Sequence, residues 1–312
     1  MDRLKSMEVF AKVVDMGSFV AAAEALGISR PMASKHVQSL EAQLGVRLLN
    51  RTTRKISLTE AGRSFHLRCQ SIFEEIDEAL IEAGNLRTEP RGTLRINAPI
   101  TFGRAHLTRT LASFQTRYPD VSIDLTLNDR FVDIVDEGFD LAIRVGRLGD
   151  SSLIARKLAP CRLVVCAAPD YLEARGMPKH PSELSGHNCL IYGYFTQDKT
   201  WSFEEEGTVV NVPVDGDFRT NLGEAVVEAA AAGRGIILEP SFTVAPYLED
   251  GRLVPILADY QPRDLTIHAV YPSSRLLPQK VRMLIDHLAK TFGATPYWDE
   301  SISQAVTAAG LS

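Results

Sequence analysis

The spacing of apolar and polar residues at the start of the chain predicts three short helices. Apolar residues recur every three or four positions in residues 3–16, and Gly17 is placed to end that helix. Ser18 is a candidate N-cap for an alanine-rich second helix in residues 19–26. Ser29 is placed in the same way before a third helix.

The third helix has two chemically different faces. Its apolar face is formed by Ala33, Val37, Leu40 and Leu44. Its polar face is formed by Arg30, Ser34, Lys35 and Gln38. Two short helices that are joined by a tight glycine turn, the second with a polar face, make a helix-turn-helix pattern. The same caps and turns also suit an ordinary helical bundle, so these residues alone leave both interpretations open.

The next segment, VRLLNRTTRKISLT, favours the helix-turn-helix interpretation. It predicts two short strands around a hairpin tip whose arginines and hydroxyls can lie along a phosphate backbone. We expect the polar face of the third helix to contact base edges in a DNA major groove. Pro31 or Met32 can touch a thymine methyl group, although packing explains Met32 equally well. Contacts to phosphates are expected from Arg51, Thr53, Arg54 and Lys55.

A long amphipathic helix is predicted after the hairpin, over residues 59–88, with Thr59 as its N-cap. Apolar residues follow at heptad spacing, at Phe65, Cys69, Ile72, Ile76, Ala79, Ala83 and Leu86. A buried helix in a monomer would show the same stripe. Because this helix lies between two domains and has nothing of its own to pack on, we expect dimerisation through Phe65, Ile72, Ile76, Ala79 and Ala83.

The body of the chain, residues 91–293, alternates predicted strands and helices, which is typical of an α/β domain with a largely parallel sheet. Helices are expected over residues 102–118, 131–137 and 223–232, and in the segment PQKVRMLIDHLAKTF. The segment WSFEEEGTVVNVPV predicts an antiparallel pair of strands. Residues 294–312 are polar and mixed, and we expect a poorly ordered tail.

Composition narrows the class of protein. The chain has 312 residues, a formal net charge of −5 and four cysteines, whose spacing fits neither a disulfide framework nor a zinc site. The N-terminus lacks the apolar core of a signal peptide, and no run of 18 apolar residues occurs, so we expect a cytoplasmic protein without membrane contact.

The charge is distributed unevenly. Residues 1–58 contain nine Lys and Arg residues against five Asp and Glu residues, which gives +4 and leaves −9 for the remainder. A basic end on an acidic body localises anion binding to that end. The sequence contains no G-x-S-x-G, phosphate-loop or H-E-x-x-H motif, and its seven histidines are scattered. We therefore expect no enzyme activity, no metal site and no cofactor.

The segment SFVAAAEALGISRPMASKHVQSLEAQLGVRLLNRTTRKISLTEAG resembles the winged helix-turn-helix signature of LysR-type transcriptional regulators. The resemblance implies a winged helix-turn-helix domain over residues 1–58, a linker and dimerisation helix over 59–88, and an effector domain over 91–293. It implies that the effector domain resembles periplasmic binding proteins, with one subdomain at 91–161 and 267–293 and another at 162–266. Arginine is common in the family where this chain has Lys35.

The resemblance also implies partners. These are an interrupted palindrome in double-stranded DNA, a second copy of the chain in a homodimer or a homotetramer (a dimer of dimers), a small-molecule effector, and RNA polymerase if the protein activates transcription. The sequence leaves open the identity of the effector and the choice between activation and repression. The alternative is a periplasmic-type solute-binding protein, which shares the body. Such a protein has no DNA-binding end, and it carries a signal peptide.

Candidate effector-binding residues follow from the same resemblance. In the family, the places of Thr101 and Asn221 face each other across a cleft. Thr101 lies where a strand passes into a helix, and Asn221 has the spacing of a capping box with Glu224. Because helix N-termini bind anions, we expect an anionic effector. Further candidate ligands of the effector are Phe102, Arg130, Phe131 and Arg144.

Overall fold

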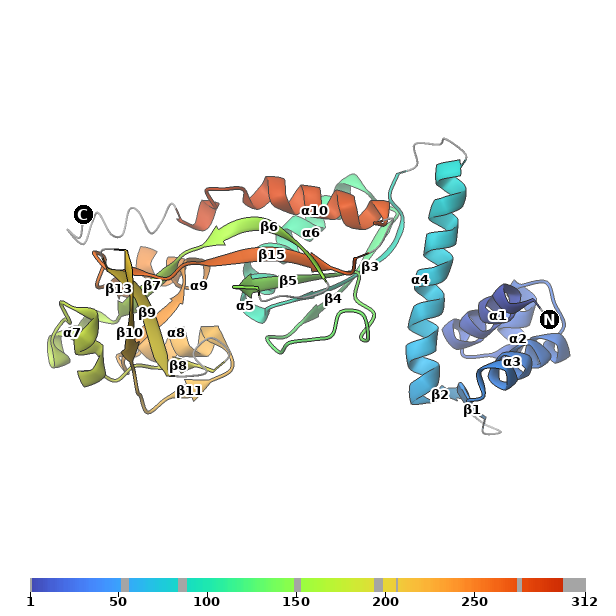
Figure 1. Ribbon diagram of the computed structural model, residues 1–312, viewed down its shortest axis with the longest axis horizontal. Coiled ribbons are helices and arrows are strands. Elements are labelled where there is room, and N and C mark those ends of the chain that lie inside the picture. The colour runs from blue at the N-terminus through green and yellow to red at the C-terminus, as the bar shows by residue number, and fades with distance from the viewer. Residues whose placement is uncertain are drawn as a thin grey trace. The chain divides into compact units, whose positions relative to one another are not determined.

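The computed structural model describes residues 2–51, 56–83, 89–148, 153–193, 199–205, 207–273 and 277–299. The chain forms two compact units. One unit comprises Met1–Glu89 and Asp133–Gly138, and the other comprises Pro90–Val132 and Phe139–Ser312. Figure 1 labels the helices and strands of both units.

The first unit begins with the three predicted helices, α1 (Arg3–Met16), α2 (Phe19–Ala25) and α3 (Arg30–Leu44). The predicted ends are confirmed. Gly17 ends α1 in the left-handed conformation, with φ 61°. The Ser18 hydroxyl accepts a hydrogen bond from the Ala21 N–H, and the Ser29 hydroxyl accepts one from the Met32 N–H. The boundaries are therefore set by local hydrogen bonds and backbone geometry.

A small hydrophobic core joins these helices. It includes Phe10, Ala33, Val37 and Leu40, all of which are buried, whereas Leu44 is exposed. Two antiparallel strands follow, β1 (Leu49–Arg51) and β2 (Ile56–Leu58), as the hairpin pattern predicted.

The long helix α4 (Glu60–Ala83) starts against this core. The Thr59 hydroxyl accepts a hydrogen bond from the Gly62 N–H at 2.9 Å, which confirms the predicted N-cap. At Gly62, a Cβ atom would lie 1.9 Å from the carbonyl oxygen of Leu48. Only glycine allows the helix to pass so close to the backbone before β1.

The second unit is built around a five-stranded sheet in the order β4-β3-β5-β15-β6 (Figure 1). Its strands are β3 (Gly92–Ala98), β4 (Val121–Leu127), β5 (Leu141–Gly146), β6 (Ile154–Cys161) and β15 (Leu265–Tyr271). Strand β3 runs parallel to β4 and β5, but β15 runs antiparallel to β5 and β6. The sheet is therefore mixed, because its last strand returns from the far end of the chain. We call this sheet and its helices, in residues 90–132, 139–161 and 265–299, lobe one.

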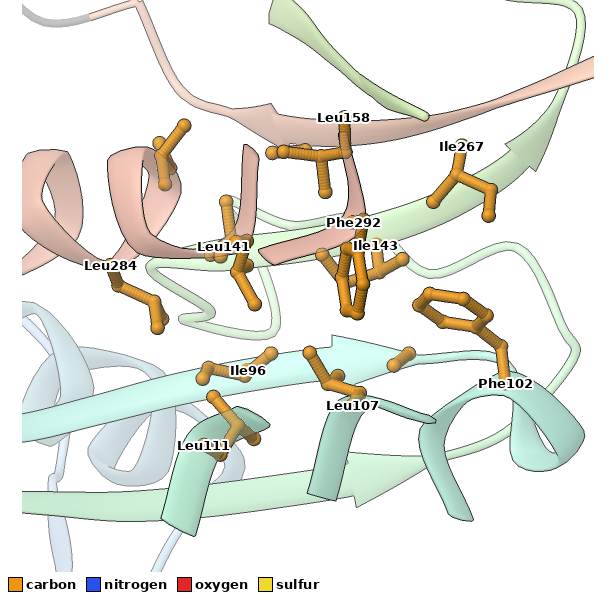
Figure 2. Close-up of a cluster of buried hydrophobic side chains, with 14 of the residues drawn as sticks. Ile96, Phe102, Leu107, Leu111, Leu141, Ile143, Leu158, Ile267, Leu284 and Phe292 are labelled. Carbon is orange, nitrogen blue, oxygen red and sulfur yellow. The ribbon is translucent and has the colours of Figure 1, made fainter. Parts of the chain in front are cut away.

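Helices pack on this sheet through an extensive apolar core. Helix α5 (Ile100–Phe102), a π-helical turn (Gly103–Leu107) and α6 (Thr108–Arg117) together occupy the predicted helix 102–118. Figure 2 shows Leu107 and Leu111 from this segment near Ile96 of β3. Helix α10 (Gln279–Phe292) contributes Leu284 and Phe292 to the same cluster.

Two predictions for segments after β4 are wrong. Residues 134–138 form turns instead of the expected helix at 131–137, and the Asp133 carboxylate accepts hydrogen bonds from the N–H groups of Val135 and Asp136 within these turns. Residues 294–299 are not a loose tail. Trp298, in the short 3₁₀ helix Tyr297–Asp299, is buried in the core against the rings of Phe102 and Phe292. The rest of the predicted tail, residues 300–312, lies outside the described residues.

The chain leaves lobe one between β6 and β7 (Leu163–Ala167) and returns between β14 (Gln261–Pro262) and β15. Residues 162–264, which we call lobe two, have two hydrophobic clusters of their own. Strand β7 lies between β12 (Ile236–Pro240) and β13 (Val254–Pro255). The predicted antiparallel pair is confirmed as β9 (Thr200–Glu205) and β10 (Thr208–Pro213), with β14 on the other edge of β9.

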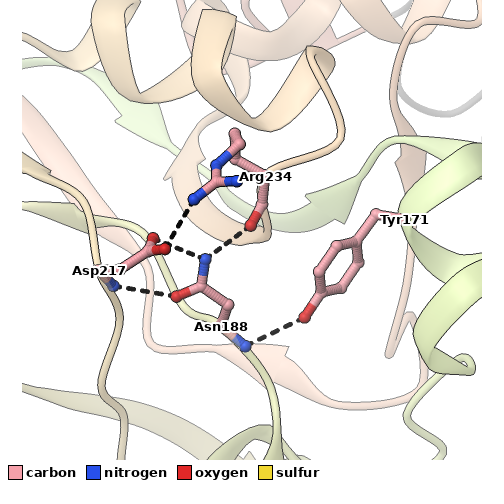
Figure 3. Close-up of polar contacts among 4 residues, drawn as sticks. All are labelled: Tyr171, Asn188, Asp217 and Arg234. Atoms are coloured by element: carbon pink, nitrogen blue, oxygen red, sulfur yellow. Dashed lines mark hydrogen bonds and ion pairs between the residues drawn. The ribbon is translucent and has the colours of Figure 1, made fainter.

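The remaining elements of lobe two are β8 (Ile191–Tyr192), which is parallel to β11 (Arg219–Thr220), and the helices α7 (Pro169–Arg175), η2 (Pro181–Gly186), α8 (Gly223–Ala231) and α9 (Ser241–Glu249). A polar network anchors the turn between α8 and β12 (Figure 3). The Asn188 amide donates to the Asp217 carboxylate at 2.8 Å and to the Arg234 carbonyl at 2.6 Å. Arg234 also pairs with Asp217 at 2.7 Å. This network fixes where β12 begins.

Candidate functional site

The polar face of α3 is exposed on the surface of the first unit. Arg30, Pro31, Lys35 and Gln38 are exposed, and Ser34 is half-buried. The opposite face carries Ala33, Val37 and Leu40, which are almost completely buried. The helix therefore places its donors and acceptors in solvent while its apolar side is fixed from beneath.

One buried contact and one partly buried contact that sequence reasoning missed hold α3 in place. The His36 ring nitrogen Nδ1 lies 3.0 Å from the Ser6 hydroxyl, which links α3 to α1. The Glu41 carboxylate accepts hydrogen bonds from the N–H groups of Leu48 and Leu49, at 2.8 and 3.1 Å. Glu41 thus attaches the start of the β1–β2 hairpin to the helix. The available signal was a polar residue on or beside the apolar face of a short helix.

The hairpin residues are only partly described. The backbone of Arg51 pairs with Ile56 in the β1–β2 ladder. Thr53, Arg54 and Lys55 lie outside the described residues. Their contacts with a phosphate backbone stay predictions.

The apolar stripe of α4 serves two purposes. Cys69 is fully buried in the core of the first unit, and burial raises the pKa of its thiol to about 12. Phe65 packs against that core, with its ring centroid 5.7 Å from that of Phe10. The expectation that this helix lacks a packing partner within its own chain is therefore wrong, because Phe65 packs against the core of the first unit.

The later part of the stripe is less covered. Ile72 is 36% exposed and Ile76 is half-buried. Ala79 and Ala83 lie on α4, but their side chains are outside the described residues. Dimerisation through these positions stays a prediction.

In the second unit, Thr101 lies at the junction between the lobes. A Cβ atom at Gly223, the first residue of α8, would lie 3.7 Å from the Thr101 hydroxyl oxygen and 3.2 Å from Glu239 Oε2. Thr101 belongs to α5 in lobe one, whereas Gly223 and Glu239 belong to α8 and β12 in lobe two. Three segments that are distant in sequence therefore meet at one point.

Two acidic side chains make polar contacts around this point. Arg104, in the π-helical turn, donates to Glu224 Oε1 from Nε at 3.0 Å and from Nη2 at 2.9 Å. Asp129, after β4, accepts a hydrogen bond from the Ile100 N–H at 3.0 Å. Burial raises the pKa of Asp129, while hydrogen bonds from Ile100 and from Tyr192 of β8 lower it.

Glu239 is the most unusual group at the junction. Its side chain is 2% exposed, and its Oε1 has no hydrogen-bond partner among the described residues. Burial, and then the charge of Asp129, raise the pKa of Glu239 well above its ordinary value. Sequence reasoning missed this residue, although a single acidic residue in the apolar run GIILEP was a signal.

The expected role of Asn221 as a helix cap is wrong. Helix α8 begins at Gly223, Leu222 occupies the N-cap position, and no side chain caps the helix. Asn221 is exposed, and Glu224 pairs with Arg104 instead of completing a capping box. The expectation of an anionic effector rests on two helix N-termini, at Thr101 and at Asn221. The acidic groups of Glu224 and Glu239 lie near the second of these, and Asp129 is close enough to affect the pKa of Glu239.

The other candidates for effector contact differ in their exposure to solvent. Phe102 has no exposed surface and packs against Phe242 and Phe292, and its contact with an effector stays a prediction. Phe131 is 87% exposed, with the Arg144 guanidinium 5.8 Å from its ring centroid. Arg144 also donates to the Asn97 amide oxygen at 2.6 Å.

Arg130 is exposed. Within the described parts of the chain, no group of three or more His, Cys, Asp or Glu residues is arranged to hold a metal ion. No helix among these residues is long and apolar enough to cross a membrane.

Comparison with known proteins agrees with both units. Residues 4–63 match the family of bacterial regulatory helix-turn-helix proteins of the LysR type, and residues 87–293 match the LysR substrate binding domain. The HTH-type transcriptional activator AaeR of Escherichia coli (strain K12) is 37% identical over 94% of this chain and 94% of its own length.

A transcriptional repressor of Pseudomonas aeruginosa (strain UCBPP-PA14) is 36% identical over 95% of this chain and 94% of its own length. Among solved structures, the LysR-type regulator CrgA of Neisseria meningitidis has a TM-score of 0.59 and 33% identity. That similarity covers 92% of this chain and 97% of CrgA.

Proposed function

Because this chain belongs to the LysR family of transcriptional regulators, we propose that the polar face of α3 reads operator DNA and that a small molecule at the lobe junction controls this binding. The DNA-binding and substrate-binding domains of the family account for the two units. The finer assignments, of residues, effector and assembly, are ours.

The exposed polar face of α3 carries the DNA-binding part of the proposal. A major groove admits one α-helix, and its base edges are read by hydrogen-bond donors and acceptors such as Arg30, Ser34, Lys35 and Gln38. Pro31 is placed beside them in the first turn of the helix. Arg51, Thr53 and Arg54 would then contact phosphates, which contributes affinity without sequence preference.

A gel shift tests this assignment. The full-length protein should retard the intergenic DNA upstream of its own gene at concentrations where an unrelated duplex of equal length and base composition stays free. Equal retardation of both duplexes at every salt concentration would contradict sequence-specific binding. The alternative function, a solute-binding protein, predicts no retardation of either duplex.

We assign the self-association to the part of α4 from Ile72 onward. A dimer, or a dimer of dimers, would place two α3 helices on the two half-sites of an interrupted palindrome. In each chain the effector domain would comprise the subdomains 91–161 with 267–293 and 162–266, and the protein would act in the cytoplasm. RNA polymerase is a partner if the protein activates transcription, and the relatives include both an activator and a repressor.

Ile76→Asp tests the association. A charge at a buried apolar contact costs several kcal/mol, so the variant should sediment as a smaller species in analytical ultracentrifugation. Its operator affinity should fall although no DNA-facing residue has changed. Val209→Asp, the same kind of change at a residue of β10 that is 42% exposed, is the control. An unchanged sedimentation coefficient for Ile76→Asp would move the dimer interface elsewhere.

A further inference from the structure

Glu239 occupies a place where a carboxyl group is costly. Its side chain is 2% exposed, lies within a fully buried strand and is paired in the backbone with Val164 of β7. Its Oε1 has no hydrogen-bond partner among the described residues. A buried polar atom without a partner normally destabilises a fold, and such atoms in native proteins call for a functional explanation.

The geometry directs this group toward the lobe junction. Glu239 Oε2 lies 3.2 Å, and the Thr101 hydroxyl oxygen 3.7 Å, from the point where a Cβ of residue 223 would stand. Because residue 223 is glycine, that point is not filled by a side chain of its own. Oxygen atoms from both lobes therefore approach the same point, at the first residue of α8.

The acidic groups around this point disfavour an anionic ligand. The Asp129 carboxyl is near enough to raise the pKa of Glu239, and it is itself partly buried. The Glu224 carboxylate lies beside Asp129, but Arg104 neutralises it at 2.9 Å. A carboxylate ligand would meet two acidic groups here, whereas a donor would supply the hydrogen bond that Glu239 lacks.

We propose that Glu239 is the ligand-selecting group of the effector site, and that the effector presents a hydrogen-bond donor, a hydroxyl or an amino group, between Glu239 and Thr101. The inference rests on the proposed effector function and specifies its chemistry. Such a ligand bridges the lobes, because Thr101 belongs to lobe one and Glu239 to lobe two. Only a ligand with different affinities for two lobe arrangements can change DNA binding.

Matched small probes on the full-length protein test the inference. The aromatic set is benzyl alcohol, benzylamine and benzoate, and the aliphatic set is 1,3-propanediol, 1,3-diaminopropane and malonate, each at millimolar concentration in a thermal-shift assay. We expect an alcohol or an amine to raise the Tm of the wild type, and the matched carboxylates to leave it unchanged. The comparison of alcohol with amine tells which donor the site prefers.

Variants assign the effect to the residue. Glu239→Leu should lose the Tm shift and weaken the apparent affinity of the active probe by about tenfold or more. Glu239→Gln, whose amide oxygen still accepts a hydrogen bond, should keep the response to the alcohol and lose the response to the amine. Glu173→Gln, at an exposed glutamate of α7, is the control and should respond like the wild type.

The unfavourable outcomes are distinct. A Tm shift by the carboxylates alone, or an equal shift by a donor probe in wild type and Glu239→Leu, overturns the inference. The absence of any shift by the four donor probes overturns it as well. The gel shift is measured on the same proteins. If a carboxylate probe alters operator binding, the effector function stands without this chemistry, and if no protein retards the operator, the proposed function itself fails.

Discussion

The face of α3 and the lobe junction both present polar side chains, but in opposite surroundings. On α3 the polar groups lie in water, and the supporting contacts are buried beneath them, through His36 and Glu41. At the junction Glu239 is itself buried, Thr101 and Asp129 are half-buried, and Oε1 of Glu239 lacks a hydrogen-bond partner among the described residues. An exposed face can select a large, charged partner at little cost to folding, whereas a buried group reserves its hydrogen bond for a small ligand.

The largest difference between the two regions is expected from glycine-to-alanine substitutions, in stability and in operator binding. In Gly62→Ala the new Cβ would overlap the Leu48 carbonyl, which is backbone and cannot move freely. We expect a loss of about 3 kcal/mol or more of stability in the first unit, and loss of operator binding. Thermal unfolding followed together with a gel shift measures both effects.

The control for this change is Gly223→Ala at the junction. Its Cβ would meet the side chain of Glu239 at 3.2 Å, which can shift slightly. The folded structure and operator binding should persist in this variant, and only the response to an effector should weaken. Equal stability of Gly62→Ala and wild type would show that the hairpin is not held by this close approach.

Lys35→Ala tests whether the exposed face of α3 carries sequence discrimination. A base contact is typically worth about 1–3 kcal/mol, so the ratio of operator to non-specific affinity should fall accordingly. Competition gel shifts measure that ratio. Gln43→Ala, at an exposed position near the other end of α3, should leave it unchanged. If Lys35→Ala weakens both affinities in the same proportion, Lys35 contacts phosphate instead.

Thr101→Val tests the junction with a smaller change. The variant keeps the shape of the side chain and removes the hydroxyl, at a cost of about 1.5 kcal/mol for a lost hydrogen bond to an effector. That cost corresponds to roughly a tenfold weaker affinity in titration calorimetry. Operator binding without effector should match the wild type. Thr126→Val, an exposed position on β4, is the control.

Glu239→Gln should produce the smallest effect, a difference in stability from the wild type that grows as the pH rises above 4.5. The pKa of Glu239 is raised in the folded protein, so the folded state binds its proton more tightly than the unfolded state does. Its contribution to stability is therefore present below the ordinary pKa of 4.5 and is lost as the pH rises through the raised value. The Tm of the wild type should fall relative to Glu239→Gln with rising pH.

Other buried carboxyls do not disturb this comparison. The pKa values of Asp140 and Asp264 are also raised by burial, but these groups are common to both proteins. A constant Tm difference between wild type and variant from acidic to alkaline pH would mean that Glu239 does not titrate in this range.

The sequence by itself determined the elements whose signals are local. Ser18, Ser29 and Thr59 were recognisable as caps because each bonds an N–H group three residues along the chain. The apolar and polar faces of α3 followed from helical periodicity, and the β9–β10 pair followed from its strand pattern. Family resemblance then indicated the head and the body, and the family matches agree with it.

The tertiary structure decided everything that depends on a distant partner. The stripe on α4 could not reveal that Phe65 and Cys69 belong to the core of their own unit, because periodicity shows a buried face and not what covers it. Trp298 looked like part of a polar tail until the core around Phe102 accommodated it. The sequence pointed to Asn221 as a helix cap and gave Glu239 no role, whereas the structure places Glu239 beside the start of α8. The position of a helix start and the burial of a carboxyl group are fixed by segments far apart in sequence.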